Sequence, residues 1–174
     1  MSYEELQKTE LFSFFHFTES GRRQSPDGFQ EIHFKPGGFP EFIDVQMKVD
    51  RTQMVHEGIL YLDRDWIGGP MTVNPFGKDL AKSFIAAVCP AKDKKNVERV
   101  VSTIWNLQGN SDKVIPLHPD GPDDLTKEVP IEEIEQVYLG TSKIFEMTCE
   151  ESCIKIENVV DIGKNRLKIT IETR

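Results

Sequence analysis

Hydrophobic and polar residues alternate most regularly over residues 42–49. The apolar members of this stretch are Ile43, Val45, Met47 and Val49, and the polar ones between them are Asp44, Gln46 and Lys48. Successive side chains of a strand point to opposite faces, so the pattern predicts a strand with one buried face. Similar stretches lie at 29–34 and 55–66, separated from it by turn-like segments. These three stretches predict an antiparallel meander.

The third stretch has a different pattern at its centre. Residues 59–62, Ile-Leu-Tyr-Leu, are apolar at every position rather than at alternate ones. A strand covered on both faces has this composition. We therefore expect helices or a second copy of the chain to cover both sides of it, and we predict a homodimer.

The middle of the chain has a helical period. Asn74 can cap a helix and Pro75 suits its first position, and the apolar residues that follow at spacings of three and four are Phe76, Leu80, Phe84, Ile85 and Val88. Pro90 ends this helix. A second helix is predicted over 93–107, with Val97, Val100, Val101 and Ile104 inward. The short link between them predicts an antiparallel helix hairpin.

Residues 109–129 show no periodicity, and a stretch of this length predicts a long mobile loop. A short helix over 131–139, ended by Gly140, and strands over 143–149, 153–162 and 166–173 complete the chain. The predicted fold class is α+β in one domain, 1–174. It contains a mainly antiparallel sheet of about six strands packed on the helix hairpin, together with an N-terminal helix.

The N-terminal stretch has two interpretations. Ser2 and Glu5 form a capping box that begins a helix, but the aromatic residues at 13–17 are compatible with either a helix or a short strand. Gly21 suits the residue after a helix, and Arg22 and Arg23 would then lie near the negative end of the helix dipole. We predict a helix ending near Gly21, with Phe14 and Phe17 docked on the sheet.

Composition excludes several classes of partner. The 174 residues include 21 basic and 29 acidic ones, a formal net charge of −8. That field repels nucleic acid and anionic lipid, and no apolar run is long enough to cross a bilayer. The N-terminus lacks the pattern of a secretory signal, and three cysteines are too few for a disulfide framework. We expect a cytoplasmic protein with no nucleic-acid or membrane partner.

Candidate chemistry is sparse. The four histidines and three cysteines have no metal-ligand spacing, so we predict no metal and no cofactor. Asp63, Arg64 and Asp65, with His56 earlier on the same predicted strand, are the catalytic candidates. Strand alternation would place the two carboxylates on one face, where they could act together. The candidate ligand-binding residues, for an anion or an aromatic ligand, are Arg22, Arg23, His16 and His33.

The segment Cys149-Glu-Glu-Ser-Cys153 predicts a hairpin in which the two cysteines lie opposite one another. Directly opposed residues are close enough for a disulfide. The compartment favours reduced thiols, and the adjacent glutamates should raise the pKa values of both.

Three functions remain open. The first is a non-catalytic binding or accessory protein that acts through its sheet surface or its long loop. The alternatives are a small enzyme with an acidic site around Asp63 and Asp65, and a carrier of a small molecule in an aromatic pocket. A deep pocket with convergent polar groups would favour the alternatives, whereas an exposed apolar patch would favour the first.

Overall fold

The protein is described by a computed structural model that covers residues 1–69, 72–106, 131–161 and 163–174. One fully antiparallel sheet of seven strands organises it, in the order β1-β2-β3-β4-β7-β6-β5. The strands are β1 (Thr18–Gln24), β2 (Gln30–Lys35), β3 (Ile43–Val49), β4 (Val55–Asp63), β5 (Ile144–Thr148), β6 (Ser152–Asp161) and β7 (Lys164–Thr173). The α+β class and the predicted meander β2-β3-β4 are confirmed, with seven strands in place of about six. The segment 109–129 lies outside the described residues.

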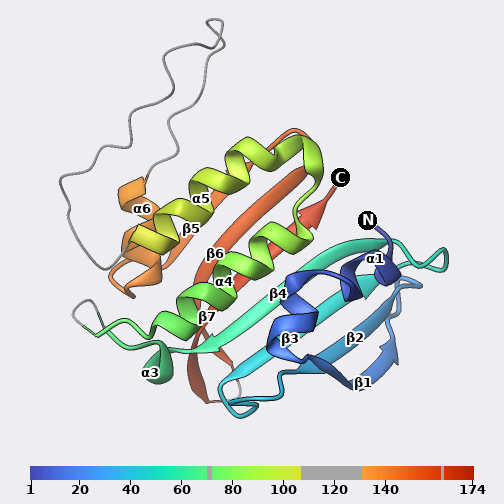
Figure 1. Cartoon of the computed structure of the whole chain (residues 1–174), viewed down its shortest axis with the longest axis horizontal. Coiled ribbons are helices and arrows are strands. Elements are labelled where there is room, and N and C mark those ends of the chain that lie inside the picture. Colours follow the sequence, from blue (N-terminus) through green and yellow to red (C-terminus); the bar gives the residue numbers. More distant parts are fainter. Residues whose placement is uncertain (70–71, 107–130, 162) are drawn as a thin grey trace, which may run out of the picture.

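Helices cover one face of the sheet (Figure 1). They are α1 (Tyr3–Gln7), α2 (Glu10–Phe15), α3 (Arg64–Ile67), α4 (Pro75–Val88), α5 (Lys94–Asn106) and α6 (Ile131–Tyr138), with a short 3-10 turn at Ala91–Asp93. Helices α4 and α5 lie side by side over the sheet. The capping box of Ser2 and Glu5 begins α1, and Asn74 caps α4 with Pro75 at its first position, both as predicted.

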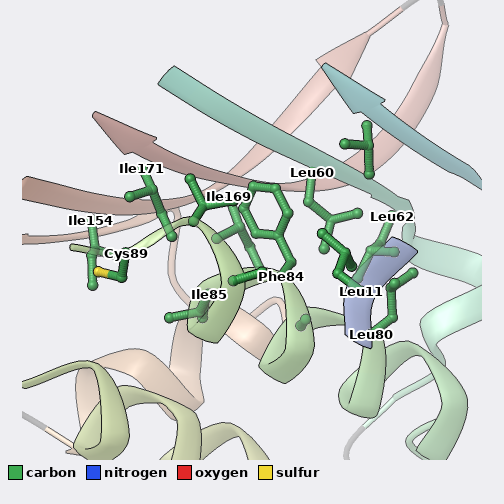
Figure 2. Close-up of a cluster of buried hydrophobic side chains, with 14 of the residues drawn as sticks. Leu11, Leu60, Leu62, Leu80, Phe84, Ile85, Cys89, Ile154, Ile169 and Ile171 are labelled. Atoms are coloured by element: carbon green, nitrogen blue, oxygen red, sulfur yellow. The ribbon is translucent and has the colours of Figure 1, made fainter. Parts of the chain in front are cut away.

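The core lies between α4 and the central strands. Leucines and isoleucines of β4, β6 and β7 face the apolar stripe of α4, as Figure 2 shows for Leu60, Leu62, Ile154, Ile169, Ile171, Leu80, Phe84 and Ile85. Gly58 of β4 permits the close approach of the helix, because a Cβ atom there would lie 2.9 Å from a methyl group of Val88. The core is therefore built from the predicted apolar positions of strand and helix.

The extra strand comes from the N-terminal stretch, where the predicted helix was too long. Helix α2 ends at Phe15, and His16 adopts a left-handed conformation with φ of 53°. The chain then enters β1, which pairs with β2 and carries a register shift between Glu19 and Gly21. Gly21 thus lies within a strand and does not end a helix. Pairing with β2, which sequence periodicity cannot detect, decides the conformation of residues 18–24.

Strand β4 is also shorter than predicted. It ends at Asp63, and α3 begins at Arg64, so strand alternation does not continue to Asp65. Along β4, Leu60 and Leu62 are buried beneath the helices, while Ile59 and Tyr61 are half-buried on the opposite, open face of the sheet. Within the described residues, helices cover only one face of this strand.

The register of β5 with β6 corrects the prediction for the two C-terminal cysteines. Cys153 lies opposite Thr148, not opposite Cys149. Cys149 is buried on the helix side, whereas Cys153 is half-buried on the open face, and all three thiols of the chain are free. The pKa values of both are raised, mainly by burial, with Asp93 adding to the effect at Cys149 and Glu146 at Cys153. The neighbouring glutamates are not the main cause.

Candidate functional site: an exposed aromatic patch

Six aromatic rings form a continuous surface at one end of the sheet. We call this surface the aromatic patch; its members are Phe14, Phe15, Phe39, Phe42, Trp66 and Phe76. Neighbouring ring centroids lie 5.0 to 5.9 Å apart, in tilted, edge-to-face or stacked arrangements. Phe15 is buried, but Phe14 is 70% exposed and Phe39 is 48% exposed. The patch therefore has a buried base and an outer rim that contacts water.

The backbone holds Phe39 in an unusual conformation. Its φ is 58°, in the left-handed region that bulky residues rarely adopt. The loop between β2 and β3 is fixed on both sides: the amide of Gly37 donates to the carbonyl of Phe15 over 3.1 Å, and Lys35 Nζ donates to the carbonyl of Pro40 over 2.8 Å. These bonds keep the Phe39 ring against Trp66 and Phe76 despite the cost of its backbone conformation.

Trp66 is positioned by its own helix, α3, and by the start of α4. The Asp63 carboxylate accepts hydrogen bonds from the amides of Asp65 and Trp66, which fixes the first turn of α3. The Asn74 side-chain amide donates to the Trp66 carbonyl over 3.2 Å. The indole ring lies against Gly77 of α4, where a Cβ atom would be 3.0 Å from the ring. Trp66 and Phe76 are consequently held as a half-buried pair of rings.

A shallow groove between α2 and α4 adjoins the patch. It has a volume of about 590 Å³ and is lined by Glu10, Ser13, Phe14, Phe15, Asp79, Lys82 and Ser83. Two carboxylates, one ammonium group and two phenyl rings thus line the groove. Asp79 Oδ1 is buried and accepts no hydrogen bond from a described residue. The groove is open to solvent and does not enclose a ligand.

The catalytic candidates do not converge. Asp63 is the cap of α3, and Asp65 is exposed in its first turn. Arg64 extends toward α6 and donates to the carbonyl of Tyr138 over 2.5 Å, and its burial lowers the pKa of its guanidinium. These three residues therefore bind backbone groups or face water.

His56 lies seven residues before Asp63, on the same strand, and contacts Asp50 instead. His56 Nε2 is 2.8 Å from Asp50 Oδ2, and the Asp50 carboxylate also accepts hydrogen bonds from the Met54 amide and from Thr52. The bond from Met54, followed by that from His56, holds the pKa of Asp50 well below its usual range. The pair stabilises the β3–β4 turn.

The candidate ligand-binding residues are divided between the two faces of the sheet, with Arg22 on the helix side and Arg23 and His33 on the open side. Arg22 pairs with Glu19 at 2.8 Å and lies over the ring of Tyr3, whereas Arg23 pairs with Glu31 at 2.5 Å. His33 is half-buried opposite Gly21, and His16 is the exposed residue that ends α2. Both arginines belong to the edge strand β1, so the prediction that they lie near the negative end of a helix dipole was wrong.

Charged side chains on the open face of the sheet form several ion pairs. Lys35 pairs with Asp44 at 2.6 Å, and Arg166 contacts both Asp44 and Asp161. Glu57 of β4 and Glu172 of β7 lie directly opposite one another. Burial, followed by the charge of Glu172, raises the pKa of Glu57. Opposite charges on neighbouring strands largely compensate each other here, so this surface is less distinctive than the patch.

Sequence reasoning missed Phe39, Phe42, Trp66 and Phe76 as parts of one site, because three separate segments contribute them. The signal that could have found Phe39 is its Pro-Gly-Gly-Phe-Pro context, which is typical of a constrained turn.

Among residues 1–69, 72–106, 131–161 and 163–174, no cluster of His, Cys, Asp and Glu could hold a metal ion. No helix in that same part of the chain is long and apolar enough to span a bilayer. Comparison with known protein families, curated proteins and solved structures gives no match.

Proposed function

We propose that this chain is a non-catalytic binding protein that recognises a protein partner through the aromatic patch. The observation that carries the proposal is Phe39, a half-exposed phenylalanine at φ 58° whose loop is fixed by hydrogen bonds to α2 and β2. The left-handed backbone of Phe39 costs the isolated protein folding free energy. Contacts between its exposed ring and a partner would offset that cost.

The position of Phe14 supports the same conclusion. It is the neighbour of buried Phe15 and remains 70% exposed, although a polar side chain would suit its place in α2 equally well. Contiguous exposed apolar surface in a soluble protein is typical of an interaction site. Large aromatic residues also dominate the binding energy of many interfaces. The patch offers such residues on a fixed scaffold.

The alternatives have less support. The enzyme hypothesis needs acid–base groups that meet at a substrate. Asp63, Arg64 and His56 instead make separate structural contacts, and Asp65 is exposed. The carrier hypothesis needs an enclosed cavity, but the rings of the patch pack against one another and the groove is open. A protein partner, which includes a second copy of the chain, is therefore better supported as the occupant of the patch than a small molecule.

A display selection tests the proposal. A random peptide library would be selected on the wild-type chain and counter-selected on the double variant Phe14→Ser, Phe39→Ser, whose folding is checked by circular dichroism. We expect enriched sequences that bind the wild type and lose at least about tenfold in affinity for the variant. Failure to enrich any sequence, or binders that ignore both substitutions, would contradict the proposal. Asp65→Ser, an exposed change beside the patch, is the matched control.

A further inference from the structure

The two edges of the sheet differ in how they are protected. Strand β1 forms one edge, where a register shift lies between Glu19 and Gly21 and the exposed side chains of Arg22 and Arg23 form ion pairs. Bulges and charges of this kind keep an edge strand from pairing with another chain. Strand β5 forms the other edge, and its register with β6 is continuous over all five residues. Its one charged residue is Glu146.

The hydrogen bonds of β5 show which of its backbone groups face outward. At the two ends of the β5–β6 ladder, the Cys149 amide donates to the Ser152 carbonyl and the Asn158 amide donates to the Lys143 carbonyl, each over 2.8 Å. Antiparallel strands bond at every second residue, so the odd-numbered residues of 143–149 bond β6 and the even-numbered ones direct their amides and carbonyls away from it. The outward residues are Ile144, Glu146 and Thr148.

These three outward residues are accessible to another chain. Ile144 is 48% exposed, and Glu146 and Thr148 are exposed as well. Within the part of the chain that the structure describes, no backbone or side-chain group bonds their outward amides and carbonyls. Such a row of donors and acceptors is a template for an added strand.

We propose that the β5 edge binds an extended segment of a partner protein as an eighth strand of the sheet. Antiparallel pairing would continue the pattern of the seven strands present. The aromatic patch contains no residue of β5, so the inference goes beyond the proposed function and does not depend on it.

A second copy of the chain fits this edge poorly. Two β5 strands related by a two-fold axis would bond through their outward residues, and their longest overlap places Glu146 opposite Glu146 of the other copy. Like charges directly opposite one another destabilise a strand pair. Lys155, the neighbour of Glu146 on β6, pairs with Glu157 at 3.0 Å instead. The edge therefore favours a different chain, with a basic residue opposite Glu146.

The two faces of β5 specify the other residues of the partner segment. Phe145 is buried on the helix side, and Met147 is half-buried on the same side, so apolar side chains beside them would extend the core. On the open face, Ile144 and Thr148 suit opposed β-branched residues. The partner segment thus alternates apolar residues toward the helices with β-branched and basic residues on the open face. Thr-Val-Lys-Val-Ile has this pattern.

Hydrogen exchange followed by nuclear magnetic resonance tests whether a strand is added. The probe is acetyl-Ser-Thr-Val-Lys-Val-Ile-Ser-amide, whose lysine would lie opposite Glu146. In the free chain, the amides of Phe145 and Met147 should exchange slowly and the three outward amides rapidly. Millimolar peptide should slow exchange of the outward amides at least about fivefold. Outward amides whose exchange the peptide leaves unchanged would overturn the inference.

Modified peptides distinguish strand pairing from other association. N-methylation of the lysine removes the donor that would bond the Glu146 carbonyl, whereas N-methylation of the valine before it removes a donor that points away from β5. We expect the first change to weaken binding at least about fivefold more than the second. Glutamate in place of lysine should weaken it severalfold, because two carboxylates then lie opposite one another. Equal affinities for the four peptides would contradict the inference.

Variants of the chain assign the effect to β5. Glu146→Lys should reverse the preference, so that the glutamate peptide binds more tightly than the lysine peptide. Glu146→Pro removes an amide that bonds nothing in β6, so the fold should persist while peptide binding falls. Glu4→Lys, the same charge change on exposed α1, is the matched control and should alter neither affinity. If the proline variant fails to fold, the charge reversal still decides the question.

Two further outcomes separate this inference from its rivals. Protection of the outward amides in the free chain, increasing with its concentration, would show that a second copy occupies the edge and would overturn the inference. The double variant Phe14→Ser, Phe39→Ser should bind the lysine peptide as the wild type does. Loss of that binding would place the peptide on the aromatic patch instead of β5, which would overturn this inference and leave the proposed function standing.

Discussion

Phe14 and Phe15 are consecutive residues of one short helix, and the structure predicts opposite outcomes for their substitution. Phe15 is 5% exposed and contacts Phe17 and Phe76, whereas Phe14 is 70% exposed. Comparison of the two substitutions therefore separates an effect on stability from an effect on binding within a single helix. This corrects the expectation that Phe14 docks on the sheet; Phe17, which is buried, does lie in the core.

Replacement of Phe15 with alanine should lower the free energy of unfolding by about 3 to 5 kcal/mol, the usual cost of deleting a buried phenyl ring. For a chain of this length, that corresponds to a decrease in melting temperature of roughly 6 to 20 °C. Replacement of Phe14 should cost less than about 1 kcal/mol, because its ring contacts little besides that of Phe15. Neither helix propensity nor charge distinguishes the two substitutions.

Urea unfolding followed by circular dichroism is the suitable assay, since its slope also reports whether the folded state has loosened. We expect the midpoint of Phe15→Ala to fall with an unchanged slope, and that of Phe14→Ala to stay near the wild type. Comparable losses for both variants would refute the placement of α2 on the sheet. Loss of peptide binding by the stable Phe14→Ala variant would support the patch.

Three further predictions follow from other parts of the chain. Because the pKa of Glu57 is raised, the folded state binds a proton at this carboxyl group more tightly than the unfolded state does. Protonated Glu57 therefore stabilises the fold below about pH 4.5, and this stabilisation is lost as the pH rises through the raised pKa. Glu57→Gln should therefore be more stable than the wild type at pH 7, by about 0.2 to 1 kcal/mol. At pH 4 the variant and the wild type should have similar stability, and thermal unfolding at pH 7 and pH 4 tests this. Asp93 is buried and accepts hydrogen bonds from the amides of Glu150 and Glu151 and from the Ser152 hydroxyl. Asp93→Ala should therefore lower the free energy of unfolding in urea by on the order of 3 kcal/mol, and an unchanged free energy would contradict this role. Light scattering at micromolar concentration should give about twice the 19.9 kDa chain mass if a second copy occupies the patch or pairs with a sheet edge, and the monomer mass at all concentrations would remove the homodimer prediction.

The sequence by itself determined most of the regular elements. The alternation over 43–49 and the spacing of apolar residues in 75–88 decide which side of each element is buried, because these periods are properties of a strand and a helix. The caps at Ser2 and Asn74 are similarly local, since a side chain there bonds an amide only two or three residues away. Such information is complete within a short window of sequence.

Only the tertiary structure decided the features that depend on contacts between separate segments of the chain. Residues 18–24 form a strand because β2, which is near in sequence but lies outside their own segment, provides partners for their backbone. The aromatic patch unites α2, the β2–β3 loop, α3 and the start of α4, which are as much as 62 residues apart between Phe14 and Phe76. Whether a phenylalanine is buried or exposed depends on what the rest of the chain places beside it, and no local period contains that information.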